Sequence, residues 1–433
     1  MGSWGPTSGP PLRDMPLTAE NATALPGPDW LRTRRAQAFE RFEATPLPTG
    51  AEEVWRYSRI ADLDLERFSA VTPSADASVP AGLQPVLDAV GPRAGLLVVR
   101  NGAVVHHEVD EALAAKGVVV GGLADVADGA DLLGATGGEQ DAFTALNEAL
   151  LPDAAVIDVP KGVIIERPIV VLEWVEGDSV AAMSRTIVRV GERAQATVVD
   201  VLASPDVDAF VAPIVELQVA DAGVLKWLGV QDLGRRVWQV GYHLSRVGRD
   251  ATLTTANVVL GGDYARVRTD SRLVGQGGSS NLLAVYFGEG TQMHDFRTLQ
   301  DHDAPRTTSD LLFKGAVEDQ SASVYSGLIR IRKGAAGTNA YQTNRNLVLG
   351  KGAHADSVPN LEIEENDVRC SHASAVGPID EDQRYYLESR GVPTEVAERL
   401  IVLGFFEEIF ERTPVPGLRE LLRSAVAAKL GAL

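Results

Sequence analysis

The feature that most constrains the fold is a stretch of about 200 residues, from about Ala154 to Pro359, in which strand signals follow one another without a credible helical segment. Short β-branched runs such as Val163-Ile164-Ile165 and Leu328-Ile329-Arg330-Ile331 are bounded by glycine or polar residues, as strands are. No proline occurs between Pro213 and Pro305, which is typical of strands that are paired on both sides. This uninterrupted β signal is long for a single sandwich and favours a repetitive architecture.

A loose recurrent pattern supports that interpretation. An apolar residue, a glycine, two further residues and a small residue recur around Gly191, Gly248, Gly275 and Gly350, with separations of 57, 27 and 75 residues. These separations lie near multiples of a coil of about 25 to 28 residues, a period in the range of solenoid repeats. Asn-Gly and Asp-Gly, the strongest hairpin signals, are absent between residues 160 and 360. The sequence therefore predicts a mainly β fold built on a degenerate β-solenoid, with a pair of β-sandwiches as the alternative.

The flanking regions differ from this core. Residues 1–28 are rich in Pro, Gly and Ser and are predicted to form a flexible leader. Residues 29–150 are predicted to form a mixed N-terminal region, with one helix from Asp29 and another over 141–151. The β core is placed at residues 151–377 and a C-terminal helical domain at residues 378–433.

The C-terminal domain contains one unusual helix. Asp380 and Gln383 resemble a capping box, and Gly391 ends the helix that they begin. The next helix starts at Thr394 and includes the run from Leu400 to Phe406, which is apolar nearly all round. Such a helix must be covered on both sides, so we expect it to pack on the β core and also to contact something else.

Composition excludes several classes of protein. With 40 Lys and Arg against 59 Asp and Glu, the formal net charge is −19 and no basic block is present, so nucleic acids and anionic membranes are poor partners. The single cysteine, Cys370, excludes an internal disulfide framework and a four-cysteine metal site made by this chain alone. No run of 18 apolar residues occurs, and the N-terminus lacks the basic and apolar parts of a secretory signal. We therefore expect a cytoplasmic protein.

The densest cluster of reactive side chains lies between Leu361 and Gly377. If this segment is a strand, Cys370 and His372 point to the same face. Thiolate and imidazole are good ligands for iron, although a buried cysteine beside a hydrogen-bonded histidine is the simpler interpretation of the spacing alone. Two such ligands do not complete a tetrahedral site. A metal or cluster held by Cys370 and His372 would therefore need ligands from a second chain.

Other candidates carry weaker signals. The segments Gly275–Gly278 and Gly350–Gly352 fit neither a Walker A loop nor a dinucleotide fingerprint, so we interpret them as turns and do not expect an ATPase. The neighbouring His106 and His107 are interpreted as a surface pair. Four possible metal ligands, His294, Asp295, His302 and Asp303, have no third-ligand pattern and are interpreted as part of a polar solenoid face or loop.

A series of motifs runs in a fixed order through the last third of the chain: Gln342 with Asn344-Arg345-Asn346-Leu347, Pro359 with Leu361-Glu362-Ile363, Cys370-Ser371-His372, Tyr385-Tyr386-Leu387, Ser389-Arg390-Gly391 and Gly404-Phe405. In this order they closely resemble the C-terminal half of the SufB and SufD scaffold proteins of the SUF system. Near the N-terminus, Trp30-Leu31, Pro46-Leu47-Pro48-Thr49 and Trp55-Arg56-Tyr57 also look like the start of SufD. The resemblance covers most of the chain and is densest after residue 340.

Within this family the SufD branch fits better. The Cys370-Ser371-His372 motif followed by Val376-Gly377 is SufD-like, whereas SufB carries Glu-His and then Ser-Lys there and usually has more cysteines. One departure is Ala373, which stands where SufD typically has glycine.

The resemblance implies a right-handed parallel β-helix flanked by N-terminal and C-terminal helical parts. It also implies a non-enzymatic scaffold subunit that pairs with SufB through the β-helices and recruits the SufC ATPase through C-terminal helices, here residues 380–430. His372 and Cys370 are carried over as the candidate metal-binding residues at the SufB interface. The implied cargo is a transient iron–sulfur cluster shared with SufB, with ATP bound by SufC and no cofactor held by this chain itself. The resemblance also allows a flavin in the complex.

Two alternatives stay open at this point. One is a SufB-like homodimeric scaffold. The other is a carbohydrate-active β-helix enzyme that uses Asp263, Arg266, Arg268 and Asp270 on one solenoid face, although an aromatic content of 6% disfavours sugar stacking. If the expected ATPase-binding helices are removed after Gly377, we expect a soluble β body to survive.

Overall fold

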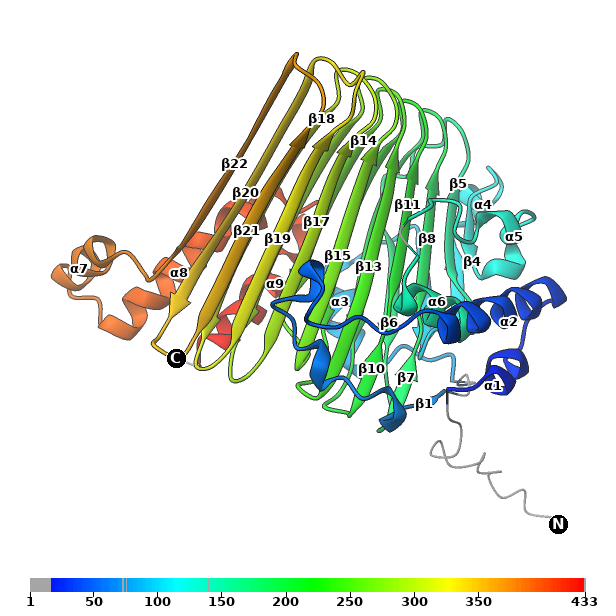
Figure 1. Cartoon of the computed structure of the whole chain (residues 1–433), viewed down its shortest axis with the longest axis horizontal. Coiled ribbons are helices and arrows are strands. Elements are labelled where there is room, and N and C mark those ends of the chain that lie inside the picture. The colour runs from blue at the N-terminus through cyan, green and yellow to red at the C-terminus, as the bar shows by residue number, and fades with distance from the viewer. Residues whose placement is uncertain (1–16, 72–73, 75, 139, 432–433) are drawn as a thin grey trace, which may run out of the picture.

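The computed structural model describes residues 17–71, 74, 76–138 and 140–431. Its centre is a parallel β-solenoid of about eight turns, with helices in the N-terminal and C-terminal parts of the chain (Figure 1). Each turn adds one strand to each of two sheets, called sheet A and sheet B. The predicted β-solenoid is confirmed. The alternative of two β-sandwiches is wrong, because the core strands pair in parallel with strands one turn away.

Both sheets run the length of the solenoid. The main path of sheet A contains β4 (Val119–Gly121), β5 (Ala155–Val159), β8 (Arg185–Val190), β11 (Ile214–Val219), β13 (Val237–Val247), β15 (Tyr264–Leu273), β17 (Met293–His302), β19 (Ala322–Ile331) and β21 (His354–Ile363). Beside it lie the short strands β1 (Ser69–Ala70), β7 (Val180–Ala182) and β10 (Ala209–Val211). Sheet B contains β3 (Ala103–Val109), β2 (Gly95–Arg100), β6 (Ile169–Trp174), β9 (Gln195–Ala203), β12 (Val224–Asp232), β14 (Thr252–Val259), β16 (Ser279–Gly288), β18 (Thr308–Glu318), β20 (Thr338–Leu349) and β22 (Val368–Gly377).

The two ends of the solenoid differ. At the N-terminal end, β3 pairs antiparallel with β2 in sheet B, and β4 pairs antiparallel with β5 in sheet A. Strands β2, β3 and β4 belong to residues 29–150, for which the sequence predicts only a mixed region. At the other end the strands are longer: β5 has five residues, whereas β21 and β22 have ten each. The stack therefore widens toward its C-terminal end (Figure 1).

The length of one turn can be measured along sheet B. Val224 pairs with Thr252, Thr252 with Ser279, Ser279 with Thr308, and Thr308 with Asn339. These steps are 28, 27, 29 and 31 residues. Two of these steps lie within the predicted 25 to 28 residues and two are longer, because the connections between the strands vary in length.

One corner of the solenoid explains three of the four glycine patterns. In successive turns this corner contains one residue with positive φ, whose N–H donates to a carbonyl of the following turn: Arg193, Ala222, Asp250, Gly277 and Arg306. Gly191, Gly248 and Gly275 precede three of these residues by two positions. A Cβ at Gly275 would lie 2.0 Å from the backbone nitrogen of Arg249 on the preceding turn. Glycine is thus required here for close approach between turns. The fourth glycine, Gly350, lies at a different corner, between β20 and β21.

The N-terminal helices cover the outer face of sheet A. They include α1 (Ala19–Ala24), α2 (Asp29–Ala44) and α6 (Ala142–Ala149), while α3 (Gln84–Val90), α4 (Glu111–Ala114) and α5 (Gly129–Leu132) lie elsewhere in the N-terminal part. Phe39, Phe143 and Phe210 belong to one apolar cluster that joins α2, α6 and sheet A. The buried Arg35 donates from Nε to the carbonyl of Leu151 at 2.8 Å, which ties α2 to the first turns of the solenoid. The helices predicted from Asp29 and over 141–151 are confirmed.

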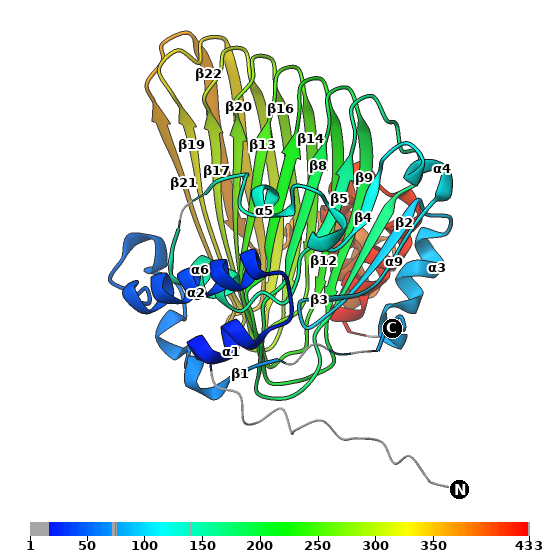
Figure 2. The ribbon, with the colours of Figure 1, turned by 90° about the vertical axis from the view of Figure 1, so that its right-hand side faces the viewer.

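The C-terminal helices cover the outer face of sheet B, on the opposite side of the solenoid from α2 (Figures 1 and 2). Those that do so are α8 (Thr394–Arg412) and α9 (Arg419–Lys429), whereas α7 (Glu381–Ser389) has no buried residue. Side chains of α8 and α9 pack with those of sheet B in one apolar cluster: Val402, Phe406, Ile409, Phe410, Leu422 and Val426 against Leu228, Val258, Leu283, Val285, Phe287 and Leu312. The expected packing of the apolar helix on the β core is confirmed. Asp380 caps α7 as predicted, accepting from the N–H groups of Asp382 and Gln383.

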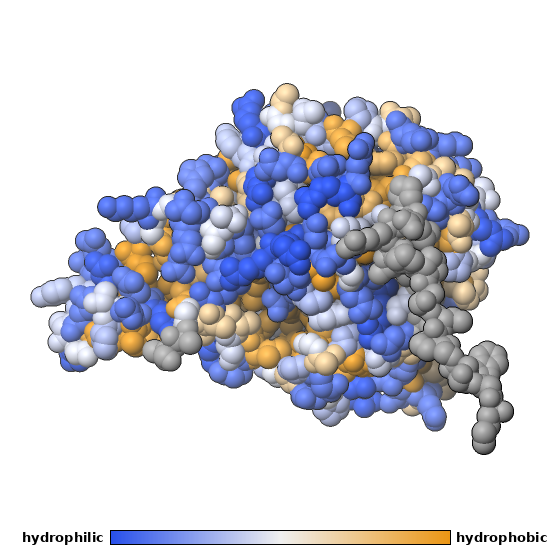
Figure 3. Space-filling view, turned by 90° about the horizontal axis from the view of Figure 1, so that it is seen from below, coloured by the Kyte–Doolittle hydropathy of each residue, from blue (hydrophilic) through white to orange (hydrophobic). Residues whose placement is uncertain are grey.

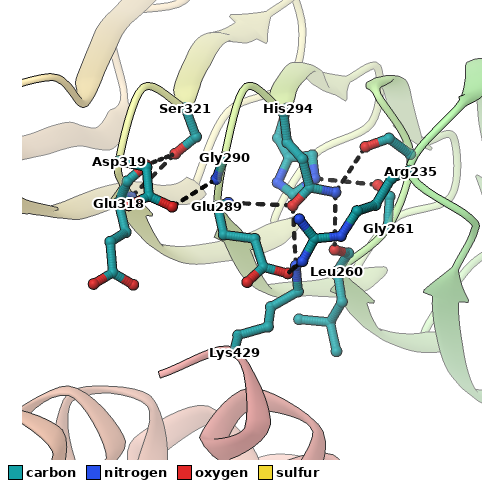
Figure 4. A network of polar contacts seen from close by, with 12 residues as sticks. Arg235, Leu260, Gly261, Glu289, Gly290, His294, Glu318, Asp319, Ser321 and Lys429 are labelled. Carbon is teal, nitrogen blue, oxygen red and sulfur yellow. Dashed lines mark hydrogen bonds and ion pairs between the residues drawn. The ribbon is translucent and has the colours of Figure 1, made fainter. Parts of the chain in front are cut away.

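The end of α9 is fixed to the solenoid by a polar network (Figure 4). Lys429 Nζ lies 3.0 Å from Glu289 Oε1 and 3.0 Å from Gln292 Oε1. Arg235 donates to the same Glu289 oxygen at 2.7 Å. Burial lowers the pKa of Lys429, and the Glu289 carboxylate opposes that shift. The last helix is therefore held at both its apolar face and its C-terminal end.

Two sequence predictions concern the N-terminus and the membrane. Residues 1–16 of the predicted flexible leader lie outside the described residues, and the part that follows contains α1, with Thr18 accepting a hydrogen bond from the N–H of Asn21. In the described part of the chain, no helix has the length and apolar character needed to cross a membrane.

Candidate functional site

The candidate site lies at the C-terminal end of the solenoid, where the stack of strands stops. Strand β21 pairs with β19, and β22 pairs with β20, and neither gains a second neighbour among the described residues. We call these two strands the open end. Large apolar side chains reach the surface on or beside it, namely Tyr341, Leu361, Ile363 and Val376. A long, regular and partly apolar strand edge of this kind is a template for pairing with another chain.

Cys370 and His372 both lie on β22, as the sequence analysis expected for a strand. In the ladder Cys370 lies beside Ala340 of β20, and His372 lies beside Gln342. Ala340 and Gln342 are buried while Tyr341 between them is exposed, so even-numbered positions of this ladder face the interior between the sheets. Cys370 and His372 thus share the inner face of the last turn, at the open end of the interior.

The two side chains have different surroundings. Cys370 is partly buried against a small apolar cluster that includes Ile329, Ile331 and Ala340. Burial raises the pKa of the Cys370 thiol, which favours the protonated and less nucleophilic form. His372 is exposed. Ala373, which departs from the usual glycine, lies in the regular strand and has no positive φ, so alanine is compatible with this backbone.

The described residues supply too few metal ligands at this site to complete a metal-binding site on their own. Across the described residues, no three side chains of His, Cys, Asp or Glu come together closely enough to hold a metal ion. Imidazole and thiol are suitable donors for iron. An iron or cluster at the open end would need further ligands from outside this chain, either from a second polypeptide or from the cargo itself.

His294, Asp295 and His302, interpreted from the sequence as part of a polar solenoid face or loop, lie on the solenoid strand β17 and are buried. His302 contacts the hydroxyls of Thr307 at 2.8 Å and Ser309 at 2.9 Å. Burial lowers the pKa of His294 to about 3 and that of His302 to about 4, so both rings stay neutral inside the solenoid. Asp303, by contrast, is exposed.

The residues considered for a carbohydrate-active site lie on the outer face of sheet A. Asp263 accepts hydrogen bonds from Arg59 and Trp238, Arg266 pairs with Asp295, and Arg268 pairs with Asp270. Arg266, Arg268 and Asp270 line a cleft of about 620 Å³ between sheet A and the segment 45–55. Each of these carboxylates already pairs with an arginine of this chain.

Two buried carboxyl groups were missed by the sequence analysis. Glu173 of β6 and Asp200 of β9 lie in the interior beside a small cavity lined also by Trp227 and His243. Burial raises the pKa of both carboxyl groups, and for Asp200 the neighbouring Glu173 adds to the shift. An acidic residue within each of two apolar strand runs was the signal that could have located them.

The remaining sequence candidates have structural roles. Gly275–Gly278 and Gly350–Gly352 form corners of the solenoid, as expected for turns. His106 and His107 are a surface pair on β3, and His107 Nδ1 lies 3.1 Å from the carbonyl of Val120.

A second surface of interest is formed by α7 and the start of α8, which project from the body beyond the last strands (Figure 1). Tyr385 is 72% exposed, Tyr386 is 58% exposed and Leu400 is 51% exposed. Apolar side chains also reach the surface at this end of the molecule when it is viewed from below (Figure 3). The apolar helix α8 is therefore covered by the body on one side and leaves Leu400 exposed on another.

Comparison with known proteins matches the chain to two family models. The model described as "SUF system FeS cluster assembly, SufBD core domain" matches residues 174–405, and the one described as "SufBD protein N-terminal region" matches residues 19–171. The chain is 32% identical over 432 residues to an iron–sulfur cluster assembly SufBD family protein of Mycobacterium tuberculosis, covering 96% of this chain and 97% of that protein.

Two relatives carry a more specific name. The chain is 28% identical to the iron–sulfur cluster assembly protein SufD of Bacillus subtilis, covering 93% of this chain and 94% of that protein. It is 27% identical to the SufD protein of Escherichia coli, covering 91% of this chain and 92% of that protein.

Proposed function

The chain belongs to the SufBD family of iron–sulfur cluster assembly proteins, and we propose that it acts there as a SufD-type scaffold subunit without catalytic activity of its own. In this role it pairs with SufB through the open end of the solenoid. The observation that carries the proposal is the position of His372 and Cys370 on the inner face of the last turn, beside a strand edge with no second neighbour among the described residues.

The cargo in this proposal is a nascent iron–sulfur cluster shared across the interface. His372 supplies an imidazole ligand, and SufB supplies the ligands that this chain lacks. Cys370 is auxiliary, because burial favours its thiol over the thiolate that binds iron. ATP is bound by SufC in this scheme. A flavin in the complex and a cytoplasmic location stay predictions.

Replacing His372 with alanine in the reconstituted complex with SufB and SufC is expected to lower the cluster yield by tenfold or more. The loss of a metal ligand should cost at least as much as the 10- to 100-fold typical of residues that only support a ligand. Cluster yield is measured from bound iron and sulfide, and subunit composition from the mass of the complex.

Ser371→Ala is the matched control, since Ser371 is a neighbour on the same strand that faces the opposite side. A normal cluster yield in His372→Ala with intact composition would reject the proposed role. A purified complex that contains two copies of this chain and no SufB would favour the homodimeric scaffold instead.

The proposed contact with SufC is placed on α7 and the start of α8. Two exposed tyrosines and an exposed leucine are typical of an interface that is covered in a complex. The double variant Tyr385→Ala and Tyr386→Ala is expected to weaken SufC binding by about tenfold or more, because truncated interface tyrosines often cost 2 kcal/mol or more.

The affinity for SufC can be measured by titration with the full chain. Tyr57→Ala is the matched control, because Tyr57 is 44% exposed and belongs to the N-terminal part of the chain. Equal SufC affinity in the double variant, the control and the unmodified chain would place the ATPase contact elsewhere.

A further inference from the structure

Several buried polar atoms of the described residues lack a hydrogen-bond partner, and Gln342 stands out among them because both atoms of its side-chain amide do. Gln342 lies on the inner face of β20 and is 1% exposed, yet neither Nε2 nor Oε1 has a hydrogen-bond partner in the described structure. The next two inward amides on the same strand are bonded: Asn344 donates to the Tyr286 hydroxyl at 2.9 Å, and Asn346 donates to Asn344 at 2.8 Å. A buried amide without a partner is costly and calls for an explanation.

The neighbours of this amide restrict what its partner can be. In sheet B, Gln342 lies between the apolar Leu311 on one side and His372 on the other. Across the interior lies Gly327, where an added Cβ would be 2.6 Å from both Nε2 and Oε1 of Gln342. Gly327 in turn lies beside Pro359 in sheet A. Glycine and proline have no polar side-chain atoms. The Tyr325 hydroxyl also lies against Gly327, 2.3 Å from the same added Cβ, and it is already hydrogen-bonded to Thr298 at 3.0 Å. Of the two residues paired with Gln342 in sheet B, His372 is the polar one.

Adjacent strands lie about 4.8 Å apart, so residues paired in register can bring their side chains into contact. A neutral imidazole has one N–H donor and one nitrogen with a lone pair. We propose that Gln342 is a positioning residue for His372: its Oε1 accepts the N–H of the imidazole, after a rotation of the exposed histidine side chain. This bond selects one tautomer and leaves the other ring nitrogen directed away from Gln342, toward the open end.

The functional purpose of this bond rests on the proposed function, because a fixed tautomer matters for a ring that binds iron. Hydrogen bonds from the non-ligating ring nitrogen to a carbonyl or carboxylate commonly orient histidine ligands and raise their basicity. The bond itself does not depend on any cargo. It can therefore be tested on the full chain alone.

The test is nitrogen NMR of the full chain with ¹⁵N-labelled histidine at pH 8. The His372 signals are identified as those missing in His372→Ala. In the unmodified chain we expect one tautomer to exceed the other by about tenfold, the effect of one added hydrogen bond to a buried acceptor. Averaged His372 ring-nitrogen signals in the unmodified chain would overturn the inference.

Gln342→Met removes the acceptor at nearly constant volume and is expected to bring the two tautomers within about twofold of each other. Gln239→Met is the matched control, because Gln239 is a buried glutamine of β13 that accepts a hydrogen bond from Gln231 at 2.8 Å and lies several turns away from His372. An unchanged His372 tautomer ratio in Gln342→Met, or an equal change in Gln239→Met, would contradict the inference.

The two proposals can fail separately. In the reconstituted complex, Gln342→Met is expected to lower cluster retention by 10- to 100-fold, as other changes next to a ligating histidine do. If His372→Ala retains a normal cluster while the tautomer is fixed by Gln342, the hydrogen bond stands and the scaffold role of His372 is wrong. If His372→Ala loses the cluster while His372 shows averaged signals, the scaffold role stands and Gln342 is not its positioning residue.

Discussion

A chain that ends at Gly377 is expected to aggregate and not to survive as a soluble β body. Helices α8 and α9 bury the outer face of sheet B, and six of their side chains in that cluster are 2% exposed or less: Val402, Phe406, Ile409, Phe410, Leu422 and Val426. Each buried side chain of this size contributes about 1.5–3 kcal/mol. Their sum is on the order of 10 kcal/mol, which is comparable with the whole stability of a typical domain.

The truncation also exposes the strand residues beneath the helices, including Leu283, Val285, Phe287 and Leu312. A contiguous apolar surface of this kind promotes association. The soluble fraction after ultracentrifugation and the binding of a hydrophobic dye measure the effect. The full-length double variant Tyr385→Ala and Tyr386→Ala is the control and should stay soluble. A monomeric truncated chain with the melting temperature of the full chain would contradict the expectation, which replaces the one drawn from the sequence.

Replacing Asp295 with asparagine is expected to lower the free energy of unfolding by about 3–5 kcal/mol, the cost of removing one partner from a buried ion pair. Asp295 is fully buried and accepts hydrogen bonds from Arg266 at 2.5 Å, Arg297 at 2.7 Å and the Tyr264 hydroxyl at 3.0 Å. The substitution leaves two buried guanidinium groups without their shared carboxylate. Chemical denaturation measures the change.

The same substitution should loosen the segment 45–60. Arg266 stacks on the Trp55 ring at 3.6 Å and donates to the carbonyl of Val54 at 2.9 Å, so its position fixes this segment on sheet A. Faster hydrogen exchange is therefore expected there. Asp303→Asn is the control, because Asp303 is exposed near the end of the same strand. A loss of stability below about 1 kcal/mol in Asp295→Asn would show that the two arginines are satisfied by other groups.

The solenoid could be predicted because its cause is local. Short β-branched runs, the absence of proline between Pro213 and Pro305, and glycines at one corner all follow from the requirements of parallel ladders and close turns. Two of the four measured turns exceed the predicted length, because the spacing of the patterned glycines does not report the length of every connection. The burial of His294 and His302 could not be predicted, since it depends on partners that other turns supply.

The candidate site was predictable only in part. Alternation along a strand places Cys370 and His372 on one face, but only the pairing with β20 shows that this face is the inner one. The role inferred for Gln342 depends on residues of several strands, because Leu311 and Gly327 have no polar side-chain atoms that could bond to its amide. Sequence spacing does not contain that information.

The length of the last strands restricts which proteins can pair with the open end. At about 3.3 Å per residue, the ten residues of β22 span roughly 33 Å, against roughly 17 Å for the five of β5. A narrower solenoid placed against the open end would leave backbone donors and acceptors at the edges of the interface exposed to water or without hydrogen-bond partners. The width of the last turn therefore favours a partner protein whose own terminal turn is equally wide, independently of contacts between individual side chains.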